Sequence, residues 1–254
     1  MRILSLDTTT RDGSAAIVED DRVVDVRRGD GSRSHAERLP GELIALVDAH
    51  GFSFRDVDVF AVASGPGSFT GLRIGIATVQ GLAFTCGRRV VALPALDALA
   101  HAASLLNEPG TPKPLPGTGN QQPGTRLIVS WMDAHRREVF GAAYRIVDAP
   151  PFEPERLSVV NAASVGPPSA MLEGLRAIEA AAPIVFAGDG ALMYGEEIAR
   201  VFPTAEIRPS APIAGVIGLM AVARARRGDT IDPAAIQPLY VRRPDAEVAR
   251  EARG

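Results

Sequence analysis

The sequence contains a single cysteine, Cys86, and no long uninterrupted run of apolar residues. One cysteine cannot form a disulfide within the chain or a cysteine-rich metal site. A membrane-spanning helix needs about 20 consecutive, predominantly apolar residues, and none of this kind is present. The first residues read as a strand, without the apolar stretch and cleavage site of a signal peptide. We therefore expect a cytoplasmic protein that makes no membrane contact.

Motifs for metal binding and nucleophilic catalysis are also missing. The four histidines, His35, His50, His101 and His135, are too widely spaced for a His-x3-His pair on one helix. Ser68 lies between glycines, but its spacing differs from the Gly-x-Ser-x-Gly turn of hydrolases. These absences predict that the chain has neither a catalytic residue nor a metal ligand.

The charge balance argues against direct binding of nucleic acid. The formal net charge is -3, and the arginine pairs are scattered and offset by acidic residues. Because neutralisation of phosphates supplies most of the affinity for nucleic acid, a protein that bound tRNA alone should carry a basic surface. We therefore expect any role in RNA binding to depend on a partner.

Apolar strand patterns alternate with helical ones along the chain, which is typical of an α/β protein. Asp7 and Asp133 each end an apolar strand that is followed by a turn and a returning strand. This weak internal repeat predicts two related lobes that face a cleft. Residues 107–125 contain five prolines and four glycines, so we expect a flexible insertion between an N-terminal lobe, 1–106, and a C-terminal lobe, 126–254.

Six residues are candidates for a nucleotide site in that cleft: Asp7, Thr8, Asp133, Gly188, Asp189 and Gly190. Carboxylates at two strand ends could hold a magnesium-nucleotide, because Mg²⁺ prefers carboxylate and water oxygens. The Gly-Asp-Gly segment could let the backbone approach the ligand. At each position, a purely structural role in a turn explains the residue equally well.

The glycine-rich segment that begins at Gly65 leads from a strand into a helix, where an anion could bind. It lacks the Lys-Ser/Thr pair of a P-loop, so a tight strand-to-helix turn is the favoured interpretation. Gly71 and Gly75 are one helical turn apart, and we expect them to permit close packing of another helix.

Five segments resemble the TsaB (YeaZ) family. The most specific is the eleven-residue string from Gly65 to Gly75, GPGSFTGLRIG. The other four are Ile3–Thr10, Ser34–Pro40, Asp133–Val139, in which His135 replaces the family's usual arginine, and Pro238–Arg242. The resemblance covers essentially the whole chain except residues 107–125.

This resemblance implies the actin-like ATPase fold, an α/β fold with two related lobes and mixed sheets. It also implies a catalytic paralogue, TsaD, an ATPase, TsaE, and transfer of threonylcarbamoyl to N6 of adenosine 37 in tRNA. TsaD holds the metal, and this chain lacks the corresponding His-x3-His. The chain is thus expected to be a non-catalytic subunit without a cofactor of its own. ATP or ADP at the complex interface, and a homodimer of the chain alone, are left open.

The family pairs with TsaD through two helices, which here correspond to His35–His50 and Phe69–Cys86. The residues predicted to bind the partner are Leu39, Leu43, Val47, Leu72, Gly75, Ile76 and Val79. The alternative is that these apolar stripes face the chain's own sheet.

Two enzyme classes are the alternatives to a non-catalytic subunit. A stand-alone nucleotide-dependent kinase or ATPase of the same fold would use the interlobe cleft. A metallopeptidase would need metal ligands, and the absence of these ligands from the sequence argues against it.

Overall fold

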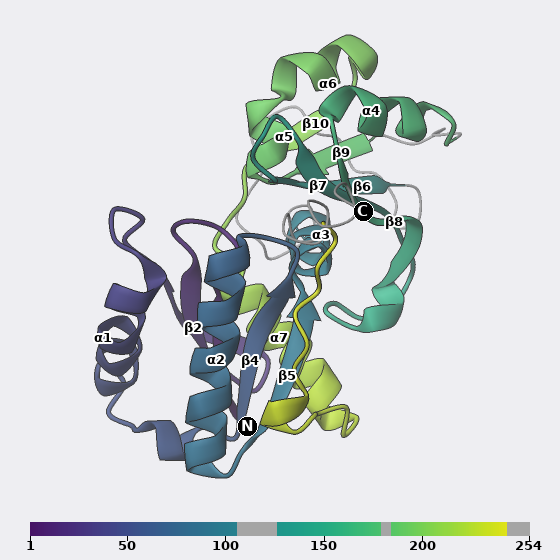
Figure 1. The fold of residues 1–254 in the computed structure, drawn as a ribbon. Helices are drawn as coiled ribbons and strands as arrows, with labels where there is room; N and C mark the ends of the chain where they lie inside the picture. The colour runs from purple at the N-terminus through teal and green to yellow at the C-terminus, as the bar shows by residue number, and fades with distance from the viewer. Residues whose placement is uncertain (106–125, 179–183, 243–254) are drawn as a thin grey trace, which may run out of the picture.

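A computed structural model describes residues 1–105, 126–178 and 184–242 (Figure 1). These residues form two five-stranded mixed sheets, with helices packed on both faces of each. The predicted insertion at 107–125 lies outside the described residues. Within the described ranges, no helix is long and apolar enough to cross a membrane.

The first sheet has the strand order β3-β2-β1-β4-β5. Its strands are β1 (Arg2–Asp7), β2 (Ser14–Glu19), β3 (Arg22–Arg28), β4 (Val59–Gly65) and β5 (Arg89–Pro94). The central strand β1 pairs antiparallel with β2 and parallel with β4. Because β1 and β4 are parallel, their carboxyl ends lie at the same edge of the sheet.

The second sheet repeats this topology, with the order β10-β9-β6-β7-β8. Its strands are β6 (Leu127–Asp133), β7 (Val139–Ile146), β8 (Leu157–Gly166), β9 (Ile184–Ala187) and β10 (Glu206–Arg208). Strand β6 pairs antiparallel with β7 and parallel with β9, as β1 does with its own neighbours. The predicted actin-like class, two related α/β lobes with mixed sheets, is confirmed.

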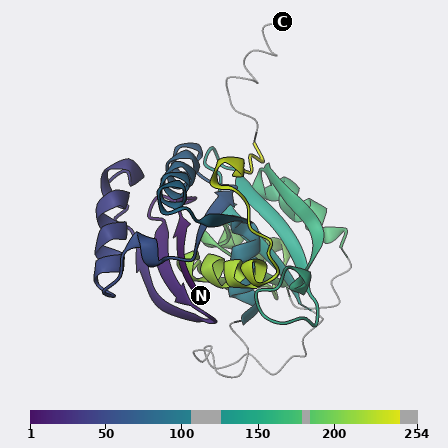
Figure 2. The same ribbon diagram turned by 90° about the horizontal axis from the view of Figure 1, so that it is seen from below.

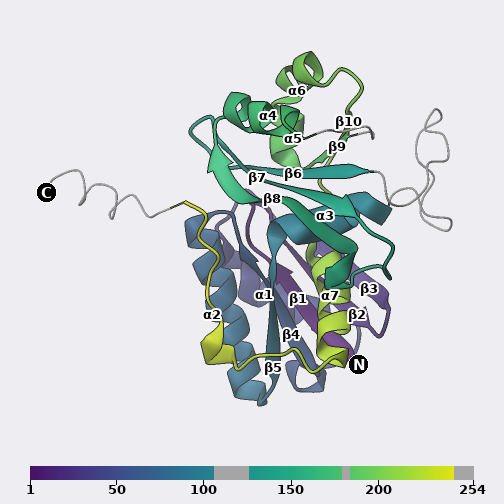
Figure 3. The same cartoon turned by 90° about the vertical axis from the view of Figure 1, so that its right-hand side faces the viewer.

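The helices form three layers around the two sheets (Figures 1 and 3). The helices are α1 (His35–Asp48), α2 (Phe69–Cys86), α3 (Ala95–Leu105), α4 (Pro168–Arg176), α5 (Asp189–Met193), α6 (Gly195–Val201) and α7 (Ala214–Arg226). Three short 3-10 helices are η1 (Phe54–Asp56), η2 (Pro154–Arg156) and η3 (Pro233–Ala235). In Figure 2, α1 and α2 lie on one side of the first sheet and α7 lies on the other.

Alternation along the central strands assigns side chains to these layers. In β1, Leu4 and Leu6 join the apolar cluster under α1 and α2, whereas Ile3 joins the cluster around α3 and α7. In β6, Trp131 faces the outer helices and Ile128 faces the central layer. Both central strands are therefore buried on both faces, which explains their nearly continuous apolar sequences.

Helices α3 and α7 exchange places between the lobes. Helix α3 follows the first sheet in sequence but packs on β6 to β9, and α7 follows the second sheet but packs on β1 to β5. Equivalent serines anchor the two helices, because Ser5 Oγ donates to the carbonyl of Ala214 at 2.7 Å and Ser130 Oγ to that of Leu96 at 2.9 Å. The predicted boundary therefore separates the two sheets but not the two physical lobes, since α7 belongs to the first.

Two helical glycines test this packing. A Cβ at Gly218 in α7 would overlap the Val18 side chain and lie 2.9 Å from Ser5 Oγ, whereas a Cβ at Gly81 in α2 meets nothing within 4 Å. Gly218→Leu should lower the free energy of unfolding by about 2 kcal/mol or more, because it overpacks the core. Gly81→Ala should raise it by about 1 kcal/mol through helix propensity. Urea denaturation of both variants measures the difference, and equal effects would contradict the packing.

Candidate functional site

The turn between β1 and β2, residues 8–13, contacts two of the family-like sequence segments. These are Ser34–Pro40, at the start of α1, and Gly65–Gly75, at the start of α2. The Asp7 carboxylate caps this turn by accepting hydrogen bonds from the backbone N–H of Thr9 at 2.8 Å and from its hydroxyl at 2.6 Å. Aspartate commonly stabilises a turn in this way, two residues ahead of the donor. Asp7 is therefore a structural member of the turn as well as a residue at the strand end.

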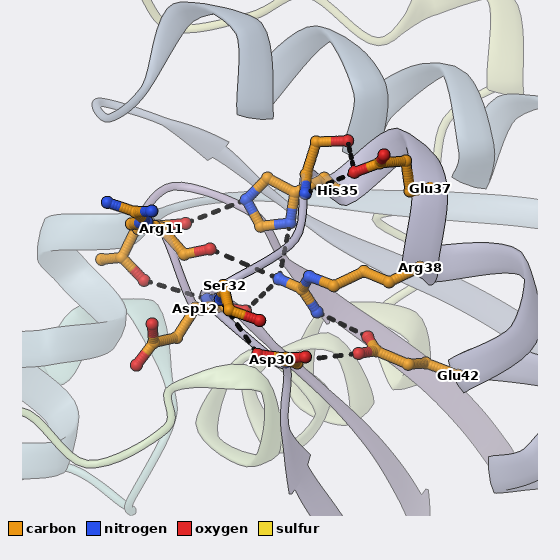
Figure 4. Close-up of polar contacts among 11 residues, drawn as sticks. Arg11, Asp12, Asp30, Ser32, His35, Glu37, Arg38 and Glu42 are labelled. Atoms are coloured by element: carbon orange, nitrogen blue, oxygen red, sulfur yellow. Dashed lines mark hydrogen bonds and ion pairs between the residues drawn. The ribbon is translucent and has the colours of Figure 1, made fainter.

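Helix α1 holds the turn through His35 and Arg38 (Figure 4). His35 Nε2 lies 3.0 Å from the carbonyl oxygen of Thr10, and the Arg38 guanidinium donates to the carbonyls of Arg11 and Asp12. Glu42, one helical turn further, accepts from Arg38 at 2.5 Å. Buried backbone carbonyls need partners, and α1 supplies them to three successive residues of the turn.

The network requires a neutral His35. The Thr10 carbonyl can only accept, so the proton is on Nε2, and Nδ1 accepts from Arg38 at 2.8 Å. Burial lowers the pKa of His35 below its ordinary value, and the neighbouring Arg38 charge lowers it further. The helix begins with a capping box, in which the Glu37 carboxylate accepts from the Ser34 backbone N–H at 2.9 Å.

The glycines of the GPGSFTGLRIG string pack against the same turn. A Cβ at Gly67 would lie 2.5 Å from Thr9 Cβ, and Cβ atoms at Gly71 and Gly75 would overlap the carbonyl and hydroxyl of Thr8. The expected close approach is real, but the element that approaches α2 is this turn rather than another helix. The string is thus a packing surface for Thr8 and Thr9.

An interlobe cleft of about 430 Å³ lies beside the turn. Of the six predicted nucleotide-site residues, only Asp7 and Asp189 line it, one from each lobe. Asp12 adds a third carboxylate, and Arg11 and Arg28 add positive charge. Burial raises the pKa of Asp7, and the charge of Asp189 raises it further.

The other four candidates do not line this cleft, and they make packing or turn contacts. Thr8 is completely buried under α2. A Cβ at Gly188 would overlap the Trp131 carbonyl and one at Gly190 would lie 2.9 Å from the Met132 backbone, so both glycines serve the packing of α5 on β6. The Asp133 carboxylate accepts from the backbone N–H of His135 at 2.8 Å. A nucleotide site at the six residues stays a prediction.

The structure places the predicted partner-binding residues inside the first lobe, and their role in binding a partner stays a prediction. All seven are buried: Leu39, Leu43, Val47, Leu72, Gly75, Ile76 and Val79. Five of them belong to the apolar cluster that holds α1 and α2 on the sheet: Leu39, Leu43, Val47, Ile76 and Val79. The exposed faces of the two helices consist largely of other residues, although Leu43 also lines the groove between them.

Those exposed faces enclose an apolar groove of about 600 Å³ between α1 and α2. Its lining includes Pro40 and Ile44 from α1, Ala77 and Gly81 from α2, and Arg55 as its one charged residue. Ile44 is 50% exposed, and Phe84, further along α2, is 83% exposed. A contiguous apolar surface such as this groove marks a site of interaction more strongly than single exposed apolar side chains do.

Sequence reasoning missed Ile44, Gly81 and Phe84 because it followed only the most regular apolar stripe of each helix. A second signal was present, since Ile44 directly follows Leu43 and must point to a different face. Within the described residues, no group of three or more histidine, cysteine, aspartate or glutamate side chains could hold a metal ion.

The raised pKa of Asp7 has a consequence for stability. A carboxyl group with a raised pKa in the folded state contributes stability below its ordinary pKa of about 3.8 and loses that contribution as the pH rises through the folded value. Asp7→Asn keeps an oxygen for Thr9 but carries no charge. The variant should be more stable than the wild type at pH 7, and the difference should shrink toward pH 4.

Asp20→Asn is the control, because the N-terminal ammonium lowers the pKa of Asp20 and reverses the sign. This variant should be less stable than the wild type at pH 7. Urea denaturation between pH 4 and pH 7 measures both differences. An Asp7→Asn difference that is independent of pH would contradict the burial argument.

Sequence comparisons extend along most of the chain. A family model described as TsaD: tRNA N6-adenosine threonylcarbamoyltransferase matches residues 29–249. An uncharacterised protein of Mycobacterium tuberculosis is 33% identical over 248 residues, which cover 96% of this chain and 93% of that protein. The tRNA threonylcarbamoyladenosine biosynthesis protein TsaB of Escherichia coli is 30% identical over 145 residues, 57% of this chain and 55% of that protein.

Solved structures give the same relationship. YeaZ from Pseudomonas aeruginosa superposes with a TM-score of 0.69 and 27% sequence identity, over 94% of this chain and 99% of that one. The family model spans far more than half of this chain, and the named relatives in sequence and structure include TsaB and YeaZ. The chain therefore belongs to the family of TsaD and its paralogue TsaB, on the TsaB (YeaZ) side.

Proposed function

We propose that the chain is a non-catalytic subunit of the machinery that modifies tRNA with threonylcarbamoyl at N6 of adenosine 37. In this role it binds a TsaD protein and, together with TsaE, activates it. The observation that carries the proposal is the apolar groove between α1 and α2, which offers a surface for another protein. Relatives named for threonylcarbamoyladenosine biosynthesis support the choice of pathway.

The groove has the chemistry of a protein interface. Its floor is apolar, its one charged lining residue is Arg55, and Gly81 and Ala77 allow a backbone to approach closely. Charged residues are typically depleted at the centre of such interfaces. A helix of the partner, laid along α1 and α2, would bury Ile44 and complete a helical bundle.

The remaining components follow from this arrangement. RNA would reach the chain only within the complex, because the net charge of -3 favours no direct contact with phosphates. ATP or ADP would bind where the subunits meet, because four of the six residues predicted for a nucleotide do not line the chain's own cleft. A second copy of this chain is the competing occupant of the groove when the partner is absent.

A reconstituted reaction tests the function. The chain alone should not modify tRNA, whereas addition of TsaD, TsaE and threonylcarbamoyl-adenylate should produce modified tRNA. Mass spectrometry of tRNA nucleosides measures the product. Modification at an unchanged rate when this chain is omitted would overturn the proposal.

Substitution in the groove tests the surface. Ile44→Asp places a charge at the centre of the groove and should weaken binding to TsaD at least about tenfold, or about 1.4 kcal/mol. Val159→Asp, on the exposed strand β8 of the other lobe, is the matched control, because Val159 is 61% exposed. Calorimetric titration measures both affinities. Equal binding by the two variants would exclude the groove as the interface.

One observation favours a second candidate, a stand-alone kinase or ATPase. Asp7 and Asp189 meet at the interlobe cleft from opposite lobes, as carboxylates that bind a magnesium-nucleotide would. The two candidates differ in their behaviour without a partner. Turnover of Mg-ATP by the isolated chain, abolished by Asp189→Asn, would establish the kinase or ATPase.

A further inference from the structure

The C-terminal segment Leu239–Arg242 crosses from one lobe to the other. It follows η3, runs along α2 and ends beside the turn between β6 and β7 (Figures 1 and 3). Crossover helices α3 and α7 join the lobes through the central layer, so this segment is a separate connection. It also forms one wall of a second cleft between the lobes, of about 500 Å³.

Its first half is attached to the N-terminal lobe. The backbone N–H of Leu239 donates to the Ser64 carbonyl at 2.7 Å. The Tyr240 ring stacks on Phe69 with 5.3 Å between ring centroids, and its hydroxyl accepts from Arg73 Nε at 3.1 Å. The Arg73 guanidinium in turn lies 4.0 Å from the centre of the Phe69 ring.

This attachment needs a glycine beneath it. A Cβ at Gly65 would lie 2.6 Å from the Leu239 carbonyl oxygen, so the segment lies directly on the junction between β4 and α2. The same glycine opens the GPGSFTGLRIG string. Two family-like segments that are far apart in the sequence, Gly65–Gly75 and Pro238–Arg242, are thus in direct contact.

The second half is attached to the C-terminal lobe through Arg242. Its guanidinium donates to the Ala134 carbonyl at 2.9 Å, pairs with the Glu138 carboxylate and lies 5.6 Å from the centre of the Phe140 ring. Arg242 is only 27% exposed in this position, which reduces solvent screening of the pair.

We propose that Leu239–Arg242 is an interlobe clasp that limits the opening of the two lobes. Its two attachments act in series, because one short stretch of chain carries the restraint from the β4–α2 junction to the β6–β7 turn. Release of either end therefore removes this restraint, and release of the second end adds little. The inference concerns the isolated chain and does not depend on the proposed partner.

Distances between spin labels on the full-length chain test the clasp. One label is placed on each lobe through Asp48→Cys in α1 and Arg200→Cys in α6, with Cys86→Ser to avoid a third site. Arg242→Gln and Tyr240→Ala should each shift the distance distribution to longer values and broaden it. The double variant should show no larger shift than the stronger single variant, because links in series do not add.

Arg2→Gln is the matched control. Arg2 also combines an ion pair, with Glu19 at 2.6 Å, and a ring contact, 4.2 Å from the centre of Phe52, but both partners lie in its own lobe. It should leave the interlobe distance unchanged. Glu138→Gln, which keeps the other Arg242 contacts, should give a smaller shift of the same sign if Arg242→Gln does not fold. Unchanged distances in folded clasp variants, or additive shifts in the double variant, would overturn the inference.

Discussion

The backbone of the turn at residues 8–13 is the constraint on which the first lobe depends. The carbonyl of Thr9 accepts from the Ser68 backbone N–H at 2.8 Å, and the next three carbonyls of the turn are bound by His35 and Arg38 of α1. Unpaired buried carbonyls would destabilise the fold by an amount comparable to lost hydrogen bonds. The turn consequently fixes where α1 and the start of α2 lie on the sheet.

In this arrangement, one face of each helix packs against its own lobe and the other face is exposed to solvent. At the start of α2, the inward face carries Gly71, Leu72 and Gly75, and the two glycines allow the turn to pack closely. On the outward face, Gly81 lines the groove beside α1 and Phe84 is exposed, whereas Phe69 stacks on Tyr240. A surface built on helices held this firmly is pre-organised, and a partner loses little conformational entropy in binding to it.

The lobes are connected on two sides of the molecule. Helices α3 and α7 exchange partners in the central layer, where Ser5 and Ser130 bind equivalent helix carbonyls. The segment ending at Arg242 connects the lobes again beside the start of α2. Since Tyr240 contacts Phe69 and Arg73 on the exposed edge of α2, the connection between the lobes lies next to the surface proposed for the partner.

Much of this protein was determined by local sequence. The alternation of apolar residues predicted an α/β fold, and the strand ends at Asp7 and Asp133 predicted the repeated lobes. The GPGSFTGLRIG string and its companion segments identified the family. These features could be read because strand periodicity, caps and turns depend on neighbours within a few residues.

Only the tertiary structure decided which face of each helix or strand is buried in the core and which is exposed. Leu43 and Ile76 were assigned to a partner and proved to be core, while Ile44, the next residue after Leu43, lies in solvent. Gly188 and Gly190 were assigned to a nucleotide and proved to support packing on β6. The exchange of α3 and α7 was likewise invisible, because a helical stripe specifies that a face is buried but not which sheet buries it. That choice rests on contacts between residues a hundred or more positions apart, such as Ser5 with Ala214.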